Sequence, residues 1–423
     1  MSTIPRLLEY QGKALLRDAR IPVPEAGLAC TVEEAGRIAD QIGRPVVVKA
    51  QVLTGGRYKA GGIRFAARPK EAEEAAKALL GSQLRGFSVE SVLVEEKLDI
   101  EKEYYLGVIV DDSYKTKGPM LVFSTEGGID IEETASKTPE KISQIKIDVL
   151  RGVRSYDAYN LILKLGIHAS MLQPLGEVVR LVYDAFRRYE ARVLEVNPLV
   201  VTRDGRILAA DCRMTIDDSA VPRHPELGVV FPRETDRPPT KLDRTAWTIE
   251  EGDYRGVAYF LQIVPEIKES GYIGFHGIGG GGALLAADAL LRHGLKIANY
   301  ADTSGNPTAA KVYRIAKIIL SQPGIEGYFL GGACIASQEQ WHHAHGIVKA
   351  LREELKDRQG FPVIVLLAGN KEKEALEIIR KGLGDLPIRF ELYGRDHVYS
   401  VDYLAERMKM LVDEYAKSFK AEG

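Results

Sequence analysis

The chain has 423 residues, of which 45% are hydrophobic and 27% are charged. This length suggests two or three domains, and 57 Lys and Arg against 59 Asp and Glu give a net charge of −2, which argues against a nucleic-acid or membrane-surface protein. The three cysteines lie far apart and no apolar stretch is long enough to cross a bilayer, so we expect a soluble cytoplasmic protein.

The first half of the chain mixes helices with hairpins, which is typical of an α+β domain. Leucines and alanines between residues 7 and 16 recur at helical spacing. Two strand–loop–strand blocks follow, at 45–65 and 91–110. A third block starts at Arg192, and its Asp204-Gly205 turn predicts a tight hairpin.

The second half has a different pattern. The segment 221–242 holds five prolines and many charges, which predicts a linker. From about Gly271 apolar strands alternate with helical patterns, and this rhythm predicts a parallel, doubly wound sheet. The predicted helices begin near residues 283, 308, 337, 371 and 400. We therefore expect an N-terminal domain at 1–220, a linker at 221–245 and a C-terminal domain at 246–423.

A glycine-rich loop at 54–62 joins two predicted strands and is a candidate phosphate site. It holds four glycines, with Arg57 and Lys59 among them, and glycine lets backbone N–H groups approach a polyphosphate closely. Lys49 ends the strand before the loop and could supply a point charge for phosphate. On these residues alone, a flexible hairpin tip is an equally good interpretation.

Three polar residues of the third block form a candidate Mg²⁺ site. Glu195 and Asn197 are two apart on one strand and share a face, and the hairpin can return Asp211 close to Asn197. A carboxylate and an amide oxygen suit Mg²⁺, which takes few protein ligands. On the residues alone, however, solvent-facing polar groups at the end of a hairpin are the favoured interpretation.

Two glycine motifs of the second half are candidate anion sites. Gly277 to Gly282 fits G-x-G-x-x-G between a strand and a helix, with Asp302 beyond it, which suggests a dinucleotide-binding oxidoreductase. Gly331-Gly332 lies between a strand and the helix expected from Ser337, where freed N–H groups and the helix dipole favour an anion.

Histidines of the second half are further candidate site residues. His342, His343 and His345 fall on two faces of one amphipathic helix, so a partly exposed polar face is favoured over a metal cluster. His276 ends a strand beside the glycine run and could belong to a site or to the core.

Several motifs in a fixed order resemble the β subunit of succinyl-CoA synthetase and its relatives. They are EYQ, VVVKAQV, GGRYKAGG, VLVEE, EYYLG, STEGGIDIEE, LEVNPLV and DGRILAADCRM. The resemblance implies an N-terminal ATP-grasp domain followed by a flavodoxin-like or Rossmann-like, doubly wound C-terminal CoA-ligase domain. Several ordered motifs together are far more specific than any one of them.

The resemblance also implies roles for individual residues. Gly56, Arg57 and Tyr58 would belong to a lid loop over the nucleotide, although the family usually has glycine at Tyr58. Lys49 would contact the nucleotide phosphates, Glu95 and the backbone up to Leu98 would hold the adenine side, and Glu103 would bind the ribose side. Asn197 and Asp211 would bind Mg²⁺, and Glu195 would face a phosphorylated histidine.

The acid site departs from succinyl-CoA synthetase. The stretch from Ala298 to Pro307 and the longer spacing after Gly331-Gly332 are more similar to ATP-citrate lyase and citryl-CoA synthetase. The resemblance implies that Ser304, Gly305, Asn306, Gly331, Gly332 and the turn to Ser337 cradle the acid. Ala368 stands where an arginine is expected to grip citrate, so either a partner supplies cations or the acid is smaller.

The resemblance implies an ATP-dependent acid–thiol ligase subunit that converts citrate, CoA and ATP to citryl-CoA, ADP and phosphate. No histidine of this chain lies in the family's phosphorylated motif. A partner α-type subunit, in an αβ or α2β2 assembly, would therefore supply the phosphohistidine and bind most of the CoA. The alternatives are a succinate–CoA ligase β subunit, an NAD-dependent oxidoreductase, and a scaffold chain that binds nucleotide without chemistry.

Overall fold

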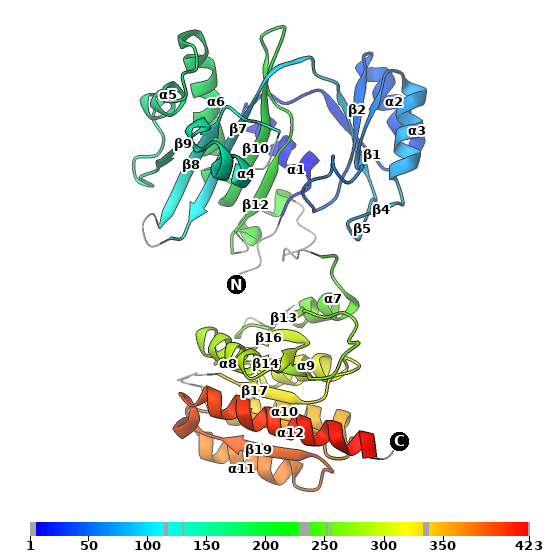
Figure 1. Ribbon diagram of the computed structural model, residues 1–423, viewed down its shortest axis with the longest axis vertical. Helices are drawn as coiled ribbons and strands as arrows, with labels where there is room; N and C mark the ends of the chain where they lie inside the picture. Colours follow the sequence, from blue (N-terminus) through cyan, green and yellow to red (C-terminus); the bar gives the residue numbers. More distant parts are fainter. Residues whose placement is uncertain are drawn as a thin grey trace. The chain divides into compact units, whose positions relative to one another are not determined.

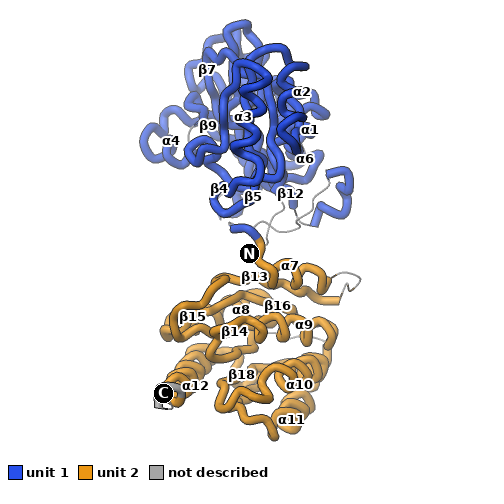
Figure 2. The backbone as a smooth tube through the Cα atoms, turned by 90° about the vertical axis from the view of Figure 1, so that its right-hand side faces the viewer, with its two compact units in different colours: residues 1–238 blue, residues 239–423 orange. Residues whose placement is uncertain are grey.

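The computed structural model forms two compact units, Met1–Pro238 and Pro239–Gly423 (Figures 1 and 2). It describes residues 6–113, 117–128, 131–217, 219–227, 237–250, 253, 255–332 and 338–421. None of the helices within these ranges is both long enough and apolar enough to cross a membrane.

The first unit contains a small antiparallel sheet with two helices on one face. Its strands are β1 (Ala26–Ala29), β6 (Val92–Glu96), β2 (Val46–Ala50) and β3 (Ile63–Ala66), in that order. The covering helices are α2 (Val32–Ile42) and α3 (Pro69–Leu79). Their inward positions are mostly alanines, which lets the helices lie close to the valines of β2 and β6.

The first unit also contains a larger antiparallel sheet that carries the main hydrophobic core. Its strands are β11 (Ile207–Ala209), β10 (Ala191–Thr202), β7 (Ile100–Asp111), β8 (Gly118–Ser124) and β9 (Ile142–Lys146), with β12 (Arg213–Ile216) also on β10. The helices are α1 (Glu9–Asp18), α4 (Ile131–Lys137), α5 (Ser155–Leu163) and α6 (Ala169–Arg188). Apolar residues of α6 and the sheet fill this core.

The predicted hairpins are partly confirmed. β2 and β3 pair across the glycine-rich loop, and β10 and β11 pair with Gly205 at the tip, in the left-handed region at φ 83°. The block at 91–110 is not a hairpin, because β6 pairs within the small sheet and β7 within the large one. A small hairpin of β4 (Gln83–Leu84) and β5 (Phe87–Ser88) was not predicted.

The second unit is a doubly wound sheet with helices on both faces (Figure 1), which confirms the predicted fold class. The strand order is β13-β16-β14-β17-β18-β19, and only β13 runs antiparallel to its neighbour. Numbered along the chain, the parallel strands therefore lie in the order 2-1-3-4-5, which is flavodoxin-like. The strands are β13 (Tyr259–Gln262), β14 (Tyr272–Gly277), β15 (Lys296–Ile297), β16 (Asn299–Asp302), β17 (Tyr328–Gly331), β18 (Pro362–Leu366) and β19 (Arg389–Tyr393).

Alternate side chains of the sheet pack on the two helix layers. Phe329 and Ile364 face the layer of α8 and α12, whereas Tyr328 and Val363 face the layer of α9, α10 and α11. The helices are α7 (Lys241–Trp247), α8 (Gly281–Arg292), α9 (Ala309–Leu320), α10 (Trp341–Leu355), α11 (Glu372–Leu383) and α12 (Val401–Ala421). Part of the predicted linker, 228–236, lies outside the described residues.

Candidate functional site

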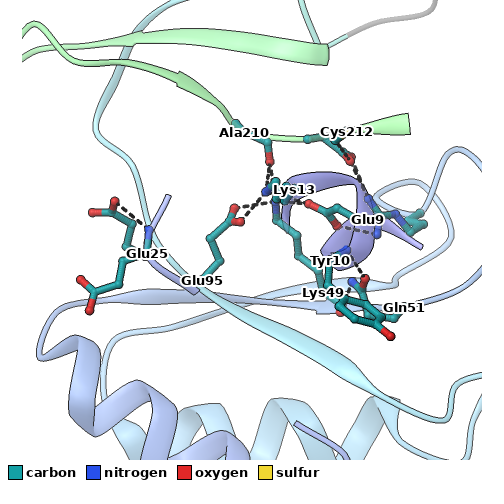
Figure 3. A network of polar contacts seen from close by, with 12 residues as sticks. Glu9, Tyr10, Lys13, Glu25, Lys49, Gln51, Glu95, Ala210 and Cys212 are labelled. Atoms are coloured by element: carbon teal, nitrogen blue, oxygen red, sulfur yellow. Dashed lines mark hydrogen bonds and ion pairs between the residues drawn. The ribbon is translucent and has the colours of Figure 1, made fainter. Parts of the chain in front are cut away.

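Lys49 lies at the centre of a buried cluster of ionised groups in the first unit (Figure 3). Strand β2 carries it, and its ammonium group donates to Glu9 Oε1 at 3.0 Å, to Glu95 Oε1 at 2.7 Å and to the Ala210 carbonyl at 2.8 Å. Burial opposes the charge, but Glu9 and Glu95 raise the pKa of Lys49 well above its ordinary value. Lys49 is therefore a fixed, permanently charged cation.

Lys13 is a second buried cation, which the sequence analysis missed. It pairs with Glu9 at 2.9 Å, donates to the Ala210 carbonyl at 2.7 Å and forms a close ion pair with Glu95 (Figure 3). Lys13 and Lys49 thus share the same three acceptors. The i,i+4 spacing of Glu9 and Lys13 on a predicted helix was the only sequence signal for this pair.

Arg57 reaches from the glycine-rich loop into the same cluster. Its guanidinium group contacts both carboxylate oxygens of Asp211, at 2.9 and 2.8 Å, and Glu9 Oε2 at 2.6 Å. Burial opposes the charge on the Glu9 carboxyl, yet Arg57 and the two lysines hold the pKa of Glu9 well below its ordinary value. The predicted lid cation is therefore bound to the predicted metal ligand.

The loop around Arg57 is an ordered turn. The Gly62 N–H donates to the Arg57 carbonyl at 2.8 Å, and Gly56 lies in the left-handed region at φ 64°, which glycine adopts at no steric cost. Tyr58 is 69% exposed, so its ring is available to a nucleotide or a partner.

The predicted nucleotide residues do not all face the same way. The Glu95 carboxylate is bound to Lys13 and Lys49, and the Glu95 backbone lies in β6 between β1 and β2. Leu98 is half-buried just beyond β6. Glu103, on β7, lies against Gly128, where an added Cβ would come within 2.6 Å of Glu103 Oε2, and burial raises its pKa.

Glu195, Asn197 and Asp211 come together in the register of β10 with its neighbours. Leu199 pairs with Ala209 and Glu195 with Arg213, and the same register puts Asn197 opposite Asp211. Asn197 Oδ1 accepts from the Gly128 N–H at 2.7 Å. Burial raises the pKa of Glu195, although Arg213 and a hydrogen bond with Asn197 oppose the rise.

This donor set fits a hard divalent cation. Asp211 and Asn197 offer carboxylate and amide oxygens, and Asp211 already attracts a cation in Arg57. No group of three His, Cys, Asp or Glu residues within the described ranges could hold a metal alone, so phosphate and water would have to complete the shell.

We predict that Arg57 competes with the metal for Asp211. Replacing Arg57 with glutamine should tighten Mn²⁺ binding in the absence of nucleotide several-fold, because Asp211 would lose its cationic partner. Electron paramagnetic resonance of free Mn²⁺ measures this affinity. Arg206→Gln is the matched control, since Arg206 pairs with Glu96 and Asp204 instead. Equal Mn²⁺ affinity in the two variants would contradict the prediction.

In the second unit, the two glycine motifs lie side by side at the carboxyl ends of β14 and β17. Gly277 pairs with Gly331, and a Cβ at Gly332 would come within 1.9 Å of the Ile278 carbonyl oxygen, so glycine is required there. The chain order reverses between these two strands, and ligands of doubly wound sheets bind at that point.

Asp302 argues against the dinucleotide interpretation. Its carboxylate accepts from the Gly279 N–H at 3.2 Å and the Gly280 N–H at 2.8 Å. These are loop amides that a pyrophosphate would need. Asp302 also accepts from the Ser304 N–H at 2.6 Å, so it fixes the predicted acid loop to the glycine run.

The predicted acid residues follow two strands that flank β14. Ser304, Gly305 and Asn306 follow β16, and Ser304 adopts φ 58°, which is uncommon for a side-chain-bearing residue. The predicted turn from Gly332 to Ser337 lies outside the described residues at 333–337. The helix expected from Ser337 begins at Trp341 instead.

The histidines correct one prediction. His276 is a buried core residue whose ring nitrogens contact the Tyr328 hydroxyl at 2.6 Å and Thr303 Oγ1 at 3.0 Å. His342 stacks on Trp341 and His345 is exposed, but His343 is fully buried and does not belong to an exposed polar face. The 3.6-residue helical period turns it inward, toward the sheet.

Comparison with known families divides the chain in the same two parts. Residues 6–201 match an ATP-grasp domain, and residues 249–404 match the citrate-binding domain of ATP citrate lyase. Both matches agree with the resemblance found in the sequence.

Two relatives in sequence are β subunits of succinate–CoA ligases. The β subunit of the GDP-forming enzyme of Thermus thermophilus is 39% identical over 376 residues, 88% of this chain and 93% of the relative. The β subunit of the ADP-forming enzyme of Rubrobacter xylanophilus is 36% identical over 378 residues, 89% of this chain and 92% of the relative.

Two neighbours in structure that span nearly the whole chain are ATP citrate lyases. The ATP citrate lyase of Methanothrix soehngenii, solved with citrate and coenzyme A, superposes with a TM-score of 0.74 at 20% identity, over 95% of this chain and 99% of the other. That of Methanosaeta concilii, solved with (3S)-citryl-CoA, gives 0.71 at 19% identity, over 93% of this chain and 96% of the other. At these identities the likeness shows the shared fold.

Proposed function

The chain belongs to the family of ATP-grasp subunits of acid–thiol ligases that includes the succinate–CoA ligase β subunits, and on this premise we propose that it activates citrate for transfer to CoA. The match of residues 249–404 to a citrate-binding domain carries this choice of acid. Succinate is the second candidate, favoured by 39% identity to a succinate–CoA ligase subunit over most of the chain.

In this proposal the first unit binds the nucleotide. Lys49 and Arg57 contact the phosphates, with Gly56 and Tyr58 in the loop above them. Glu95, Leu98 and Glu103 lie along the base and sugar. Asn197 and Asp211 hold Mg²⁺, which neutralises charge on the phosphates when it is bound. The contacts of Lys49 and Arg57 with Glu9, and of Arg57 with Asp211, support this assignment, because an ATP phosphate chain can replace the carboxylates as partner of these two cations.

The reaction then proceeds in three balanced transfers. A histidine nitrogen of the partner α-type subunit attacks the γ-phosphorus and ADP leaves. The phosphoryl group passes from the histidine to a carboxylate oxygen of the acid near Ser304, Gly305, Asn306, Gly331 and Gly332. The CoA sulfur then attacks the acyl carbon and phosphate leaves. Splitting one condensation into such steps is ordinary covalent catalysis.

The second unit supports the acyl-phosphate step by its position in the fold. The Gly331-Gly332 turn follows β17 at the reversal point of the sheet, and the Ser304 loop follows β16, on the other side of β14; backbone N–H groups at the reversal point favour an anion. CoA would be bound mainly by the α-type partner, and the working enzyme would be an αβ or α2β2 assembly.

The test is a coupled assay of this chain mixed with a candidate α-type subunit, using citrate, succinate and malate with ATP or GTP. Thioester should form only when both chains are present, and citrate should give the largest kcat/KM. Thioester made by the isolated chain would contradict the partner assignment. A larger kcat/KM for succinate would replace citrate with the second candidate.

Glu195 gives a prediction that separates stability from activity. Burial raises the pKa of its carboxyl, so ionisation costs the folded state stability as the pH rises above the ordinary value of 4.5. Glu195→Gln should therefore raise the thermal midpoint at pH 7 to 8, and the gain should vanish near pH 4. Turnover of the phosphohistidine should fall in the same variant, because Glu195 is proposed to face it. Thermal melts across this pH range measure the first effect. The rate at which the phosphorylated partner histidine loses its label after unlabelled substrates are added measures the second.

The Glu195 prediction has a clear negative result. A thermal midpoint that is lower than that of the native chain at neutral pH would mean that the pairing of Glu195 with Arg213 outweighs the cost of burial. Glu101→Gln, on the exposed part of β7, is the matched control and should change neither the midpoint nor the rate of label loss.

A further inference from the structure

The loop that leads into β13 lies at the same edge of the second sheet as the two glycine motifs. β13 is antiparallel to β16, and Tyr259 pairs with Asp302, the last residue of β16, so β13 begins at the carboxyl ends of the parallel strands. The structure describes Asp253 and residues 255–258 of this loop. Ligands of doubly wound sheets bind at that edge. The loop is therefore placed where the acid is proposed to bind.

A buried lysine fixes this loop from below. Lys311, on α9, is 1% exposed, and its ammonium group donates to the carbonyl oxygens of Asp253 at 2.9 Å, Arg255 at 2.8 Å and Gly256 at 3.4 Å. The Asp253 carboxylate lies 3.7 Å from the same ammonium group and accepts from the Thr308 hydroxyl at 2.7 Å. A buried charge is costly unless it is paired and hydrogen-bonded, so Lys311 holds the loop in one conformation.

The same loop contacts the predicted acid loop. Gly256 lies in the left-handed region at φ 65°, and a Cβ there would come within 2.8 Å of Ser304 Oγ and 2.9 Å of the Pro307 Cα atom. The Val257 N–H donates to Ser304 Oγ at 3.4 Å. Glycine at position 256 therefore allows the two loops to lie against each other.

Arg255 is anchored between the segments that follow β16 and β17. Its Nη2 donates to Gln338 Oε1 at 2.6 Å. Gln338 is buried and follows the Gly331-Gly332 turn in the chain, and its Nε2 donates to the Pro307 carbonyl at 2.7 Å. The guanidinium group is therefore held beside both segments that are proposed to contact the acid.

The positive charge of Arg255 has no carboxylate partner among the residues that the structure describes. Its side chain hydrogen-bonds the neutral amide of Gln338, and the carboxylate of the neighbouring Asp253 is bound to Thr308 and Lys311 instead. Arg255 is exposed, so the other N–H donors of its planar group are available to a ligand. That planar fork matches the two oxygens of a carboxylate.

We propose that Arg255 holds a carboxylate of the acid substrate, namely one that is not phosphorylated. The inference rests on the proposed ligase function, and it assigns to this chain the cation that Ala368 does not provide. It also names the substrate class as acids with at least two carboxylates. A monocarboxylic acid has no second group for Arg255 once its reacting carboxylate lies near Gly331-Gly332.

The test compares each acid with amides in which one carboxylate is replaced by a neutral group of nearly the same shape. Succinate is compared with succinamate, and citrate with its monoamides, in the assay with the α-type partner. The native chain should prefer the full acid by kcat/KM. Arg255→Gln should reduce that preference about 10- to 100-fold for the amide at the position that Arg255 holds, through a higher KM for the full acid. Arg255→Lys, which keeps the charge without the fork, should restore part of it.

Two controls separate the possible failures. Arg314→Gln changes an exposed arginine on α9 and should leave the preference unchanged. ATP-dependent labelling of the partner histidine should be equal in all variants, because it precedes the use of the acid. Absence of labelling with the native chain would overturn the ligase proposal itself.

A result against Arg255 alone is also defined. Normal labelling together with an equal loss of activity on the acid and its amides in Arg255→Gln would mean that the arginine only positions the loop. An unchanged preference in Arg255→Gln would overturn the proposal as well. If Arg255→Gln fails to fold, an undiminished preference in Arg255→Lys would have the same meaning.

Discussion

Replacing Asp211 with asparagine should abolish ATP-dependent phosphorylation of the partner histidine. The carboxylate is the only charged member of the Asn197–Asp211 pair, and a divalent cation stabilises the charge of a phosphoryl transition state by several kcal/mol, which corresponds to about a 1,000-fold change in rate. Labelling of the partner with γ-labelled ATP measures the effect. The fold should persist, because Asp211 is a third exposed and asparagine keeps its shape.

Asp204→Asn is the matched control for Asp211→Asn. Asp204 belongs to the same β10–β11 hairpin and also pairs with an arginine, Arg206, but it lies at the opposite, solvent-exposed end. The Asp204→Asn variant should phosphorylate the partner histidine at the native rate. Unchanged labelling in Asp211→Asn would show that the metal is held elsewhere, whatever the effect of the variant on Arg57.

The parts of the fold that could be predicted are those in which a local pattern decides the structure. Gly205 at a two-strand turn fixes the β10–β11 hairpin, and the alternation of apolar strands with helices fixes the doubly wound sheet. β6 and β7 show the limit of such patterns. They are close in sequence and both apolar, but they belong to different sheets because each has longer-range partners, β1 and β2 for one and β8 and β10 for the other.

The candidate site was predictable where its residues follow strand ends and turns. Asn197 and Asp211 could be brought together from the hairpin register alone. Glu9 and Lys13 could not, because a pair of opposite charges one turn apart on a helix is ordinarily solvent-exposed, and only the tertiary fold buries it. His343 is a similar case, since helical spacing tells which residues share a face but not which face the sheet covers.

Replacing Lys49 with methionine should have two separable effects. Lys49 is buried and paired, so its loss leaves Glu9 and Glu95 with less positive charge and should destabilise the first unit by about 3 to 5 kcal/mol. Activity should fall much further than stability at a temperature where the variant is folded, because Lys49 is also the proposed phosphate contact. Thermal melting and partner labelling measure the two effects.

Lys13 supplies the control that the Lys49 experiment needs. Its partners are the same Glu9, Glu95 and Ala210 carbonyl, so Lys13→Met should lower the melting temperature about as much as Lys49→Met. If the two lysines were merely structural, the variants would also label the partner histidine equally. We expect instead that Lys13→Met, once folded, retains most of the labelling whereas Lys49→Met loses it, because only Lys49 lies on the strand that leads into the glycine-rich loop. Equal labelling by Lys13→Met and Lys49→Met would mean that both ammonium groups serve only the stability of the first unit, and that Arg57 is the phosphate contact.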